Sequence, residues 1–134
     1  MTPITNKQLI QKAKSLIKPT RISKEISFGY VGCALVSASN KIYTGVNIDT
    51  KCGIGFCAEH SAIASMITNG EHKIKKLVAV SKDGILPPCG RCREFIHQID
   101  KNNYNTEIII GESRVVKLKN LLPYPWQRMV KNKC

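Results

Sequence analysis

Two cysteine-containing segments constrain this chain more than any other feature of its sequence. The first is Cys57-Ala58-Glu59, and the second, further along, is Pro88-Cys89-Gly90-Arg91-Cys92. Each lies where a helical run begins, so its first thiol stands near the positive end of a helix dipole and beside free backbone N–H groups, which stabilise a thiolate. Three thiolates at two helix starts can supply three ligands to a tetrahedral metal and leave the fourth position open to water. We therefore expect a fold that joins these two helix starts.

The rest of the chain is predicted to alternate between helices and strands. Apolar residues at helical spacing predict a first helix over residues 5–18, with Thr5 or Asn6 as its cap and Pro19 beyond its end. The later expected elements are a hairpin of strands 30–37 and 41–48, a loop at 51–56, a helix at 57–68, a strand at 77–80, a helix at 89–99, and strands at 107–110 and 114–118. This alternation predicts one layered α/β domain over residues 1–134, built around a single mixed sheet.

Glu59 is the candidate acid/base. It follows Cys57 by two residues, so its side chain would point beside a metal held by that cysteine and not at it. Zinc lowers the pKa of the water that it binds, and a carboxylate alongside can accept and return the proton.

Other interpretations of the cysteines stay open at this point. Cys89-x-x-Cys92 alone is also typical of a redox pair or of half of a structural zinc site, for which Cys52 could supply a fourth ligand. Against a structural site, Cys52 lies among loop residues and no second Cys-x-x-Cys follows. The remaining cysteines and histidines are expected in structural positions: Cys33 in the core, Cys134 at a loose terminus, and His72 and His97 at the surface.

Taken together, the two segments match the signature of zinc deaminases, in which His or Cys is followed by x-Glu and later by Pro-Cys-x-x-Cys, and the Glu is not a ligand. The chain resembles the cytidine deaminase family in these segments and in Val31-Gly32-Cys33-Ala34-Leu35, Gly45-Val46-Asn47-Ile48-Asp49 and Leu121-Leu122-Pro123. The resemblance implies a three-layer α/β/α sandwich around a mixed sheet of about five strands. It implies a homotetramer that deaminates a free cytosine nucleoside, cytidine or deoxycytidine, at C4. One zinc per chain would be held by Cys57, Cys89 and Cys92, with Glu59 as the catalytic acid/base.

The same resemblance implies where the substrate lies. Asn47 and Asp49 would bind ribose hydroxyls. The backbone around Ala58 and Pro87 would meet the O2 atom and the amino group of the pyrimidine, and Glu59 would also bond N3.

Three positions depart from the family's pattern. Asp49 stands where Glu is usual, so the sugar-binding acid is one methylene shorter. Gly29, next to Phe28, replaces the usual Phe of the sugar contact, so Phe28 is the remaining candidate there. His60 follows Glu59 where Arg is usual.

The absence of that arginine has an electrostatic consequence. Three thiolates around zinc carry a net negative charge, which weakens the metal as a Lewis acid unless a cation lies nearby. His60 and Arg91 are the two candidates. We expect Arg91 to matter more, because a guanidinium is always charged and an imidazole only partly so near neutral pH.

Blasticidin-S deaminases resemble the chain in further segments. They share Gly-Ile-Leu-x-Pro-Cys-Gly-Arg-Cys-Arg (84–93 here), Thr-Gly-Val-Asn (44–47) and a Trp shortly after Leu-Leu-Pro, which is Trp126 here. Blasticidin S, a cytosine nucleoside antibiotic, is therefore the alternative substrate. Trp126 would be either a substrate contact or a residue that packs subunits together.

The amino-acid composition of the chain mainly indicates which kinds of partner it could bind. The chain has 21 Lys and Arg against 9 Asp and Glu, a formal charge of +12, which would suit a metal-stabilised nucleic-acid-binding module. However, the lysines are spread along the chain and aromatic residues make up only 6%, so no base-stacking platform is evident. Cys57 in place of His also points to the free-nucleoside branch of the family.

No apolar run is long enough to span a bilayer. Lysines at 7, 12, 14 and 18 interrupt the region where the core of a signal peptide would lie. We therefore expect a cytoplasmic protein with reduced cysteines and no membrane partner.

Overall fold

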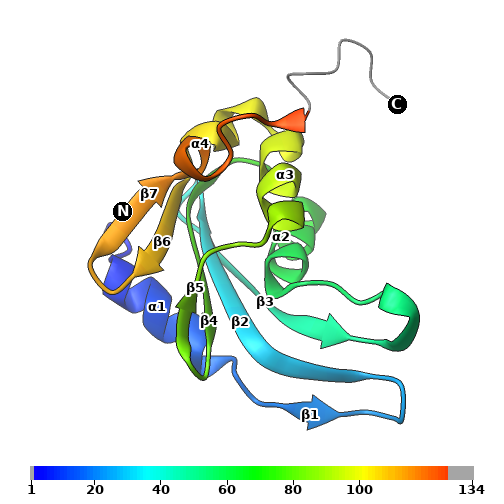
Figure 1. Cartoon of the computed structure of the whole chain (residues 1–134). Helices are drawn as coiled ribbons and strands as arrows, with labels where there is room; N and C mark the ends of the chain where they lie inside the picture. Colours follow the sequence, from blue (N-terminus) through cyan, green and yellow to red (C-terminus); the bar gives the residue numbers. More distant parts are fainter. Residues whose placement is uncertain (1, 127–134) are drawn as a thin grey trace.

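One mixed sheet organises the chain in the computed structural model, which describes residues 2–126. The elements, in chain order, are α1 (Asn6–Ser15), β1 (Thr20–Arg21), β2 (Ser27–Ser37), β3 (Ile42–Asp49), the 3-10 turn η1 (Lys51–Gly53), α2 (Ala58–Thr68), β4 (Ile74–Ser81), β5 (Gly84–Leu86), α3 (Gly90–Ile99), η2 (Lys101–Asn105), β6 (Glu107–Gly111), β7 (Arg114–Lys117) and α4 (Leu118–Leu121) (Figure 1). β2 pairs with β3 on one side and β4 on the other, and β6 and β7 follow β4. β4 and β6 are parallel, and the other pairs are antiparallel.

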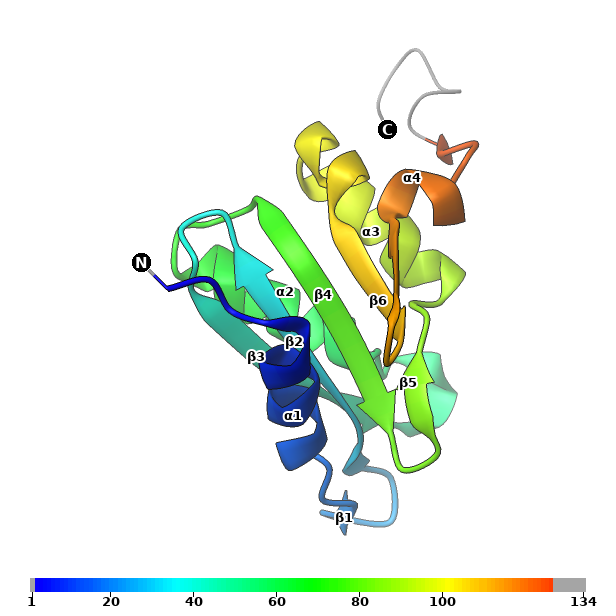
Figure 2. The same cartoon turned by 90° about the vertical axis from the view of Figure 1, so that its left-hand side faces the viewer.

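Helices cover both faces of this sheet. α1 lies on one face, across β2 and β4, while α2 and α3 lie side by side on the other (Figures 1 and 2). β2 supplies both cores because successive residues of a strand point to opposite faces. Cys33 and Leu35 join the α2 side, with Ala62, Ile63, Met66 and Ile96. Ala34 and Val36 join the α1 side, with Leu9, Ile10 and Ala13. The predicted three-layer sandwich is confirmed.

Two glycines bring the helices close to the sheet. A Cβ added to Gly32 would lie 2.2 Å from the carbonyl oxygen of Ala13 in α1, and one added to Gly45 would lie 2.3 Å from the backbone nitrogen of Ala62 in α2. Both positions therefore exclude a side chain. The close contact at Gly45 holds α2 against β3, and the first cysteine segment lies at the start of this helix.

The sheet has seven strands where about five were expected. The five longer strands are those that the sequence predicts. The two additional strands are short: β1 has two residues and pairs with the start of β2, and β5 has three and pairs with the end of β4. Strands of two or three residues are too short to show an alternation of apolar and polar side chains, so they cannot be predicted from the sequence pattern.

Element boundaries differ in three main places, the first of which is the start of β2 at Ser27 and not at residue 30. Thr5 caps α1 as expected, accepting a hydrogen bond from the Gln8 backbone N–H at 3.1 Å, but the helix ends at Ser15 and not at residue 18. The Ser15 hydroxyl donates to the Lys12 carbonyl. The backbone N–H groups of the next two residues then bond to carbonyls three residues back, as in a 3-10 turn. β4 begins at Ile74, earlier than the predicted start at 77, because lysines at 75 and 76 hide the beginning of the strand in the sequence.

The positions of the remaining cysteines and histidines are mostly as expected. Cys33 is fully buried, and the His72 side chain is 58% exposed. The prediction for His97 is wrong: it is only 3% exposed, and its ring packs edge-on against Tyr104 at a centroid distance of 5.2 Å. η2 folds back over α3 and covers this histidine, which periodicity alone does not reveal. Cys134 lies outside the described residues.

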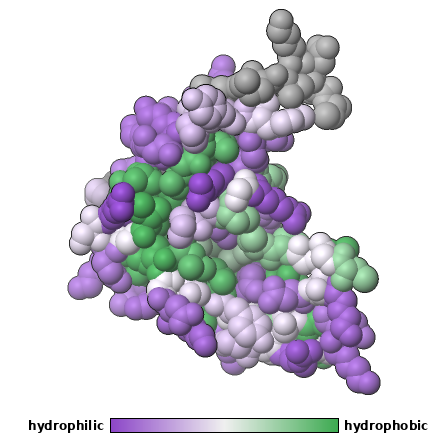
Figure 3. Space-filling view, in the orientation of Figure 1, coloured by the Kyte–Doolittle hydropathy of each residue, from purple (hydrophilic) through white to green (hydrophobic). Residues whose placement is uncertain are grey.

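The surface is mostly hydrophilic, but apolar residues gather over β6 and β7 on the face shown in Figure 3. Within residues 2–126, no helix is both long enough and apolar enough to cross a membrane.

Candidate metal centre and active site

Three cysteine sulfurs meet where α2 and α3 begin. Cys57 is the N-cap residue of α2, Cys89 is the N-cap residue of α3, and Cys92 lies in the first turn of α3. The sulfur of Cys89 is 3.6 Å from that of Cys57 and 3.5 Å from that of Cys92, and all three lie within 4.8 Å of one another. Sulfurs around a tetrahedral zinc, with bonds of about 2.3 Å, stand about 3.8 Å apart. The spacing therefore fits a zinc ion.

Cys52 does not join this group. It is exposed in η1, where its φ of 63° places it in the left-handed region, and the metal-binding cluster among the described residues comprises only the other three thiols. A closed structural site would need a fourth protein ligand. Three sulfurs without a fourth are instead the pattern of a site that keeps one position open.

The thiols differ in their affinity for a proton. Burial would raise the pKa of Cys89, but backbone N–H groups of Cys92 and Arg91 and the neighbouring thiols hold it below its ordinary value. Burial raises the pKa of both Cys57 and Cys92, and the Glu59 carboxylate raises both further. Three thiolates beside a carboxylate repel one another, so a divalent cation is needed to hold all three deprotonated.

Glu59 is buried beside the cluster. It is the second residue of α2, and its side chain is 4% exposed. Burial raises its pKa, while its own backbone N–H and the Cys92 thiol oppose part of the rise. A carboxyl group with a raised pKa takes up and releases a proton near neutral pH more readily than an exposed one does.

The ring of His60 contacts a sulfur of the cluster, whereas Arg91 meets the sulfur of Cys89 through its backbone N–H. The Nδ1 atom of His60 lies 3.6 Å from the sulfur of Cys92, and the His60 ring stacks on Phe95 with centroids 4.4 Å apart. Burial lowers the pKa of His60, and the charge of Arg91 lowers it further. Among the contacts of residues 2–126, the Arg91 guanidinium makes no hydrogen bond with a cysteine sulfur. Contact with a sulfur therefore favours His60, whereas charge favours Arg91, and the role of either residue toward a metal stays a prediction.

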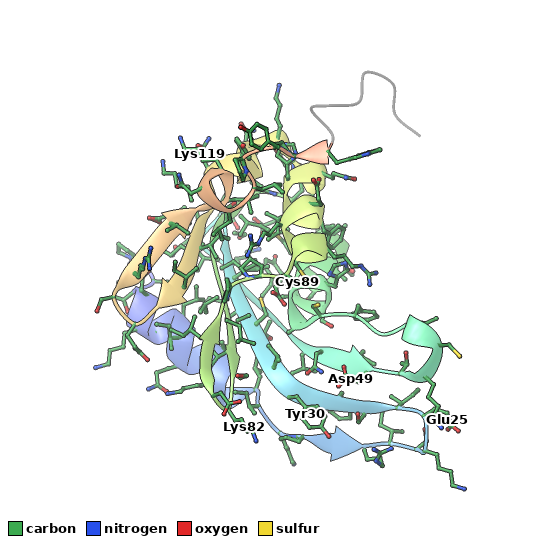
Figure 4. The ribbon with its side chains drawn as sticks, viewed as in Figure 1. Glu25, Tyr30, Asp49, Lys82, Cys89 and Lys119 are labelled. Atoms are coloured by element: carbon green, nitrogen blue, oxygen red, sulfur yellow. The ribbon has the colours of Figure 1, made fainter. Side chains whose placement is uncertain are left out.

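A cavity of about 570 Å³ opens beside the cluster. Eight of the predicted site residues line it: Asn47, Asp49, Cys57, Ala58, Glu59, Pro87, Cys89 and Arg91. They come from the end of β3, the start of α2, and the segment that leads from β5 into the first turn of α3. Figure 4 shows the labelled Cys89 at the start of α3 and Asp49 on β3. Residues far apart in the sequence thus share one small-molecule-sized space.

Two predicted substrate contacts do not line this cavity. Phe28 lies at the start of β2, and Trp126, which is 48% exposed, donates its backbone N–H to the Glu94 carboxylate at 2.6 Å. Their roles toward a substrate stay predictions.

Sequence reasoning missed one wall of the cavity, the loop from Thr50 to Phe56. Ile48 and Phe56 exchange two backbone hydrogen bonds, of 3.0 and 2.9 Å, which fold the loop back over the end of β3. A Cβ at Gly55 would lie 2.2 Å from the Ile48 carbonyl oxygen, so this return requires glycine. The glycines at 53 and 55 were the available signal for an ordered, functional turn.

Comparisons with known proteins agree with this geometry. Residues 4–107 match the family model described as the cytidine and deoxycytidylate deaminase zinc-binding region. The chain is 41% identical to the cytidine deaminase of Mycoplasma genitalium over 53% of this chain and 59% of that protein. It is 27% identical to the blasticidin-S deaminase of Bacillus cereus over 74% of this chain and 78% of that one.

A solved structure shares the fold over nearly its whole length. The cytidine deaminase of Mycobacterium leprae superposes with a TM-score of 0.73 at 26% identity, covering 90% of this chain and 99% of that one. Two of the curated matches are shorter, since the chain spans 46% and 59% of the length of two cytidine deaminases that it resembles. The family match nevertheless contains all three clustered cysteines and the buried glutamate. The chain belongs to the cytidine and deoxycytidylate deaminase family.

Proposed function

We propose that the chain is a zinc-dependent deaminase that hydrolyses the C4 amino group of a free cytosine nucleoside, with cytidine or deoxycytidine as the preferred substrate. One observation carries this proposal: Glu59 and two of the three clustered cysteines, Cys57 and Cys89, line the same cavity as Asp49 at the end of β3. Its support includes the family match and the relatives that are named cytidine deaminases.

Different residues of the site would carry out different parts of the reaction. Cys57, Cys89 and Cys92 would hold one zinc, which supplies Lewis-acid activation of water when bound. Glu59 takes the proton that water loses and delivers it to N3 of the cytosine, and it then takes the proton of the hydroxyl formed at C4 and passes it to the amino group. A C4–O bond forms, the C4–N bond breaks, and ammonia leaves. The backbone at Ala58 and Pro87, which both line the cavity, would orient the ring.

Blasticidin S is a second candidate substrate, because the match to the Bacillus cereus blasticidin-S deaminase covers about three quarters of both chains. A nucleic-acid-binding role is a candidate of another class. Within residues 2–126 the one ion pair joins His72 and Asp100 at 2.8 Å, so the other cationic side chains there have no carboxylate partner within 4 Å. That leaves a strongly positive surface, which suits a polyanion.

Release of ammonia from cytidine, deoxycytidine, blasticidin S and free cytosine tests these candidates. We expect the highest kcat/KM for cytidine or deoxycytidine, because the cavity extends from the thiols to the acidic residue that would bind a sugar. A higher kcat/KM for blasticidin S would identify the antibiotic as the preferred substrate. No ammonia from any of the four, together with a salt-sensitive shift of DNA or RNA, would contradict the proposal.

The contact between His60 and Cys92 predicts which neighbour tunes the metal. We expect His60→Ala to weaken zinc binding by about 10- to 100-fold, as loss of a group that supports a metal ligand commonly does. Arg91→Ala should have a smaller effect. Zinc dissociation constants from competition with a chromogenic chelator measure both, and His72→Ala, at an exposed histidine, is the matched control. A larger loss of zinc affinity in Arg91→Ala than in His60→Ala would instead mean that the charge of Arg91 matters more than the contact made by His60.

We further propose that the whole chain, residues 1–134, forms one domain, that it assembles as a homotetramer, and that it works in the cytoplasm. The apolar surface over β6 and β7 supports assembly, since surfaces of this kind mark interfaces. Exposed Ile54 and Trp126 support it as well.

A further inference from the structure

The side chain of Arg93, the residue after the ligand Cys92, joins two segments that lie far apart in the sequence. Arg93 is the fourth residue of α3 and is partly buried. Its Nε atom donates to the Pro88 carbonyl oxygen at 2.7 Å, and its Nη1 atom donates to the Leu121 carbonyl oxygen at 2.9 Å. Among residues 2–126, no carboxylate lies within 4 Å of its guanidinium. Arg93 thus bridges the segment before α3 and the end of α4.

The segment before α3 has no backbone donors of its own. Residues 87 and 88 are both prolines, and proline has no backbone N–H. Between the end of β5 at Leu86 and the start of α3 at Cys89, the two prolines therefore offer only carbonyl oxygens. Pro88 is buried, and a buried carbonyl needs a donor. Arg93 supplies a charged one, which makes a stronger hydrogen bond than a neutral donor does.

Arg93 also fixes the carbonyl on the other side of Cys89. Its backbone N–H donates to the Cys89 carbonyl oxygen at 3.0 Å. Arg93 therefore holds the peptide planes before and after Cys89, and these planes set the direction in which the thiol leaves the main chain. Cys89 is the central sulfur of the cluster, and Pro87, two residues earlier, lines the cavity. One arginine thus supports both a metal ligand and a wall of the cavity.

The other end of the bridge is well anchored. Leu121 is the last residue of α4, and carbonyls at the end of a helix have no partner within it. α4 lies against α3 (Figures 1 and 2), and its first residue, Leu118, is fully buried in the same core as α3. The Tyr104 hydroxyl donates to the next carbonyl, that of Leu122, at 2.9 Å. The core and η2 together hold the end of α4 in place.

We infer that Arg93 is a positioning residue of the active site, which fixes the direction of the Cys89 thiol and the course of residues 87–89 by tying them to the end of α4. The inference rests on the proposed function for its effect on turnover, whereas its effect on metal binding needs no substrate. It differs from two simpler roles. A cation that only offset the charge of the thiolates would need nothing but its charge, and a cation that only stabilised the fold would leave the site unchanged.

Arg93→Met and Arg93→Lys separate the bridge from the charge. Met keeps the apolar stem and removes every donor, whereas Lys keeps the charge but offers one nitrogen in place of two. In Arg93→Met we expect zinc to bind about 10- to 100-fold more weakly. With zinc saturating, kcat for cytidine should fall by about the same factor and KM should change little, because misplaced reacting atoms slow the chemical step. Arg93→Lys should recover only part of both losses.

Competition with a chromogenic chelator measures zinc affinity, and ammonia release measures kcat. Arg114→Met is the matched control, since it removes an equally charged side chain from an exposed position on β7. It should change neither quantity by more than about a factor of two, as is usual at exposed positions.

Two results would overturn the inference. If Arg93→Lys matched the unaltered chain in both quantities, charge alone would suffice. This comparison also decides the matter if Arg93→Met does not fold. If Arg93→Met had a lower Tm but unchanged zinc affinity and kcat, Arg93 would serve the fold only. Failure of the proposed function looks different: the unaltered chain would bind zinc but release no ammonia, and the zinc affinities of the variants would still test the bridge.

Discussion

Cys89→Ala is expected to lose zinc and deaminase activity together, from about one zinc per chain to almost none. Cys89 is the central sulfur of the cluster, 3.6 Å from Cys57 and 3.5 Å from Cys92. Its removal leaves two thiols, both with raised pKa values that favour the protonated form, which binds metal poorly. Metal analysis of the purified protein and ammonia release from cytidine measure the two losses. Cys57→Ala and Cys92→Ala should behave in the same way.

Two other cysteines provide matched controls. Cys52→Ala changes an exposed thiol outside the cluster and should keep both zinc and activity. Cys33→Ala should also keep zinc, although loss of a buried side chain lowers stability. A chelator should lower the Tm of the unaltered chain but not that of Cys89→Ala, because a metal bound only to the folded state stabilises it by mass action. Full zinc in Cys89→Ala would refute the proposed ligands.

The cluster could be predicted from sequence because its signals are local. A helix start places the thiol of Cys57 or Cys89 near free N–H groups, and the spacing to Cys92 turns a third sulfur to the same side. The same local reasoning predicts the five longer strands and both helices that carry the cysteines. Where the evidence in the sequence is a period or a motif, the structure agrees with the type of element, although α1 ends at Ser15 and not at residue 18.

What the sequence could not show are contacts that depend on tertiary packing. Charge alone ranked Arg91 above His60, but stacking on Phe95 holds the His60 ring at the sulfur of Cys92. Asn47 was assigned to the sugar by resemblance, and nothing local reveals the two β2 amides that its side chain satisfies. These contacts join strands and helices whose relative positions no single segment specifies.

Glu59→Gln is expected to fold, hold zinc, and turn over about 100- to 10,000-fold more slowly, the usual range for losing a general acid/base. Gln has nearly the same shape, so the packing at the start of α2 is preserved, but it neither accepts nor returns a proton. Glu59 is the acidic residue that both lines the cavity and lies buried beside the thiols. The loss should therefore appear in kcat, with the zinc content unchanged.

Glu94→Gln is the matched control for this prediction. Glu94 is also a partly buried glutamate, on α3 close in sequence to the ligand Cys92, but it contacts the Trp126 backbone and does not line the cavity. Its variant should keep activity within about a factor of two, since nothing in a proton-transfer step depends on it. If Glu59→Gln lost zinc as well as turnover, the carboxylate would be acting on the metal site and not only on the proton. If Glu59→Gln kept activity comparable to that of Glu94→Gln, another group would be moving the proton. Separation of zinc content from kcat in this one variant thus identifies Glu59 as the residue that carries the proton.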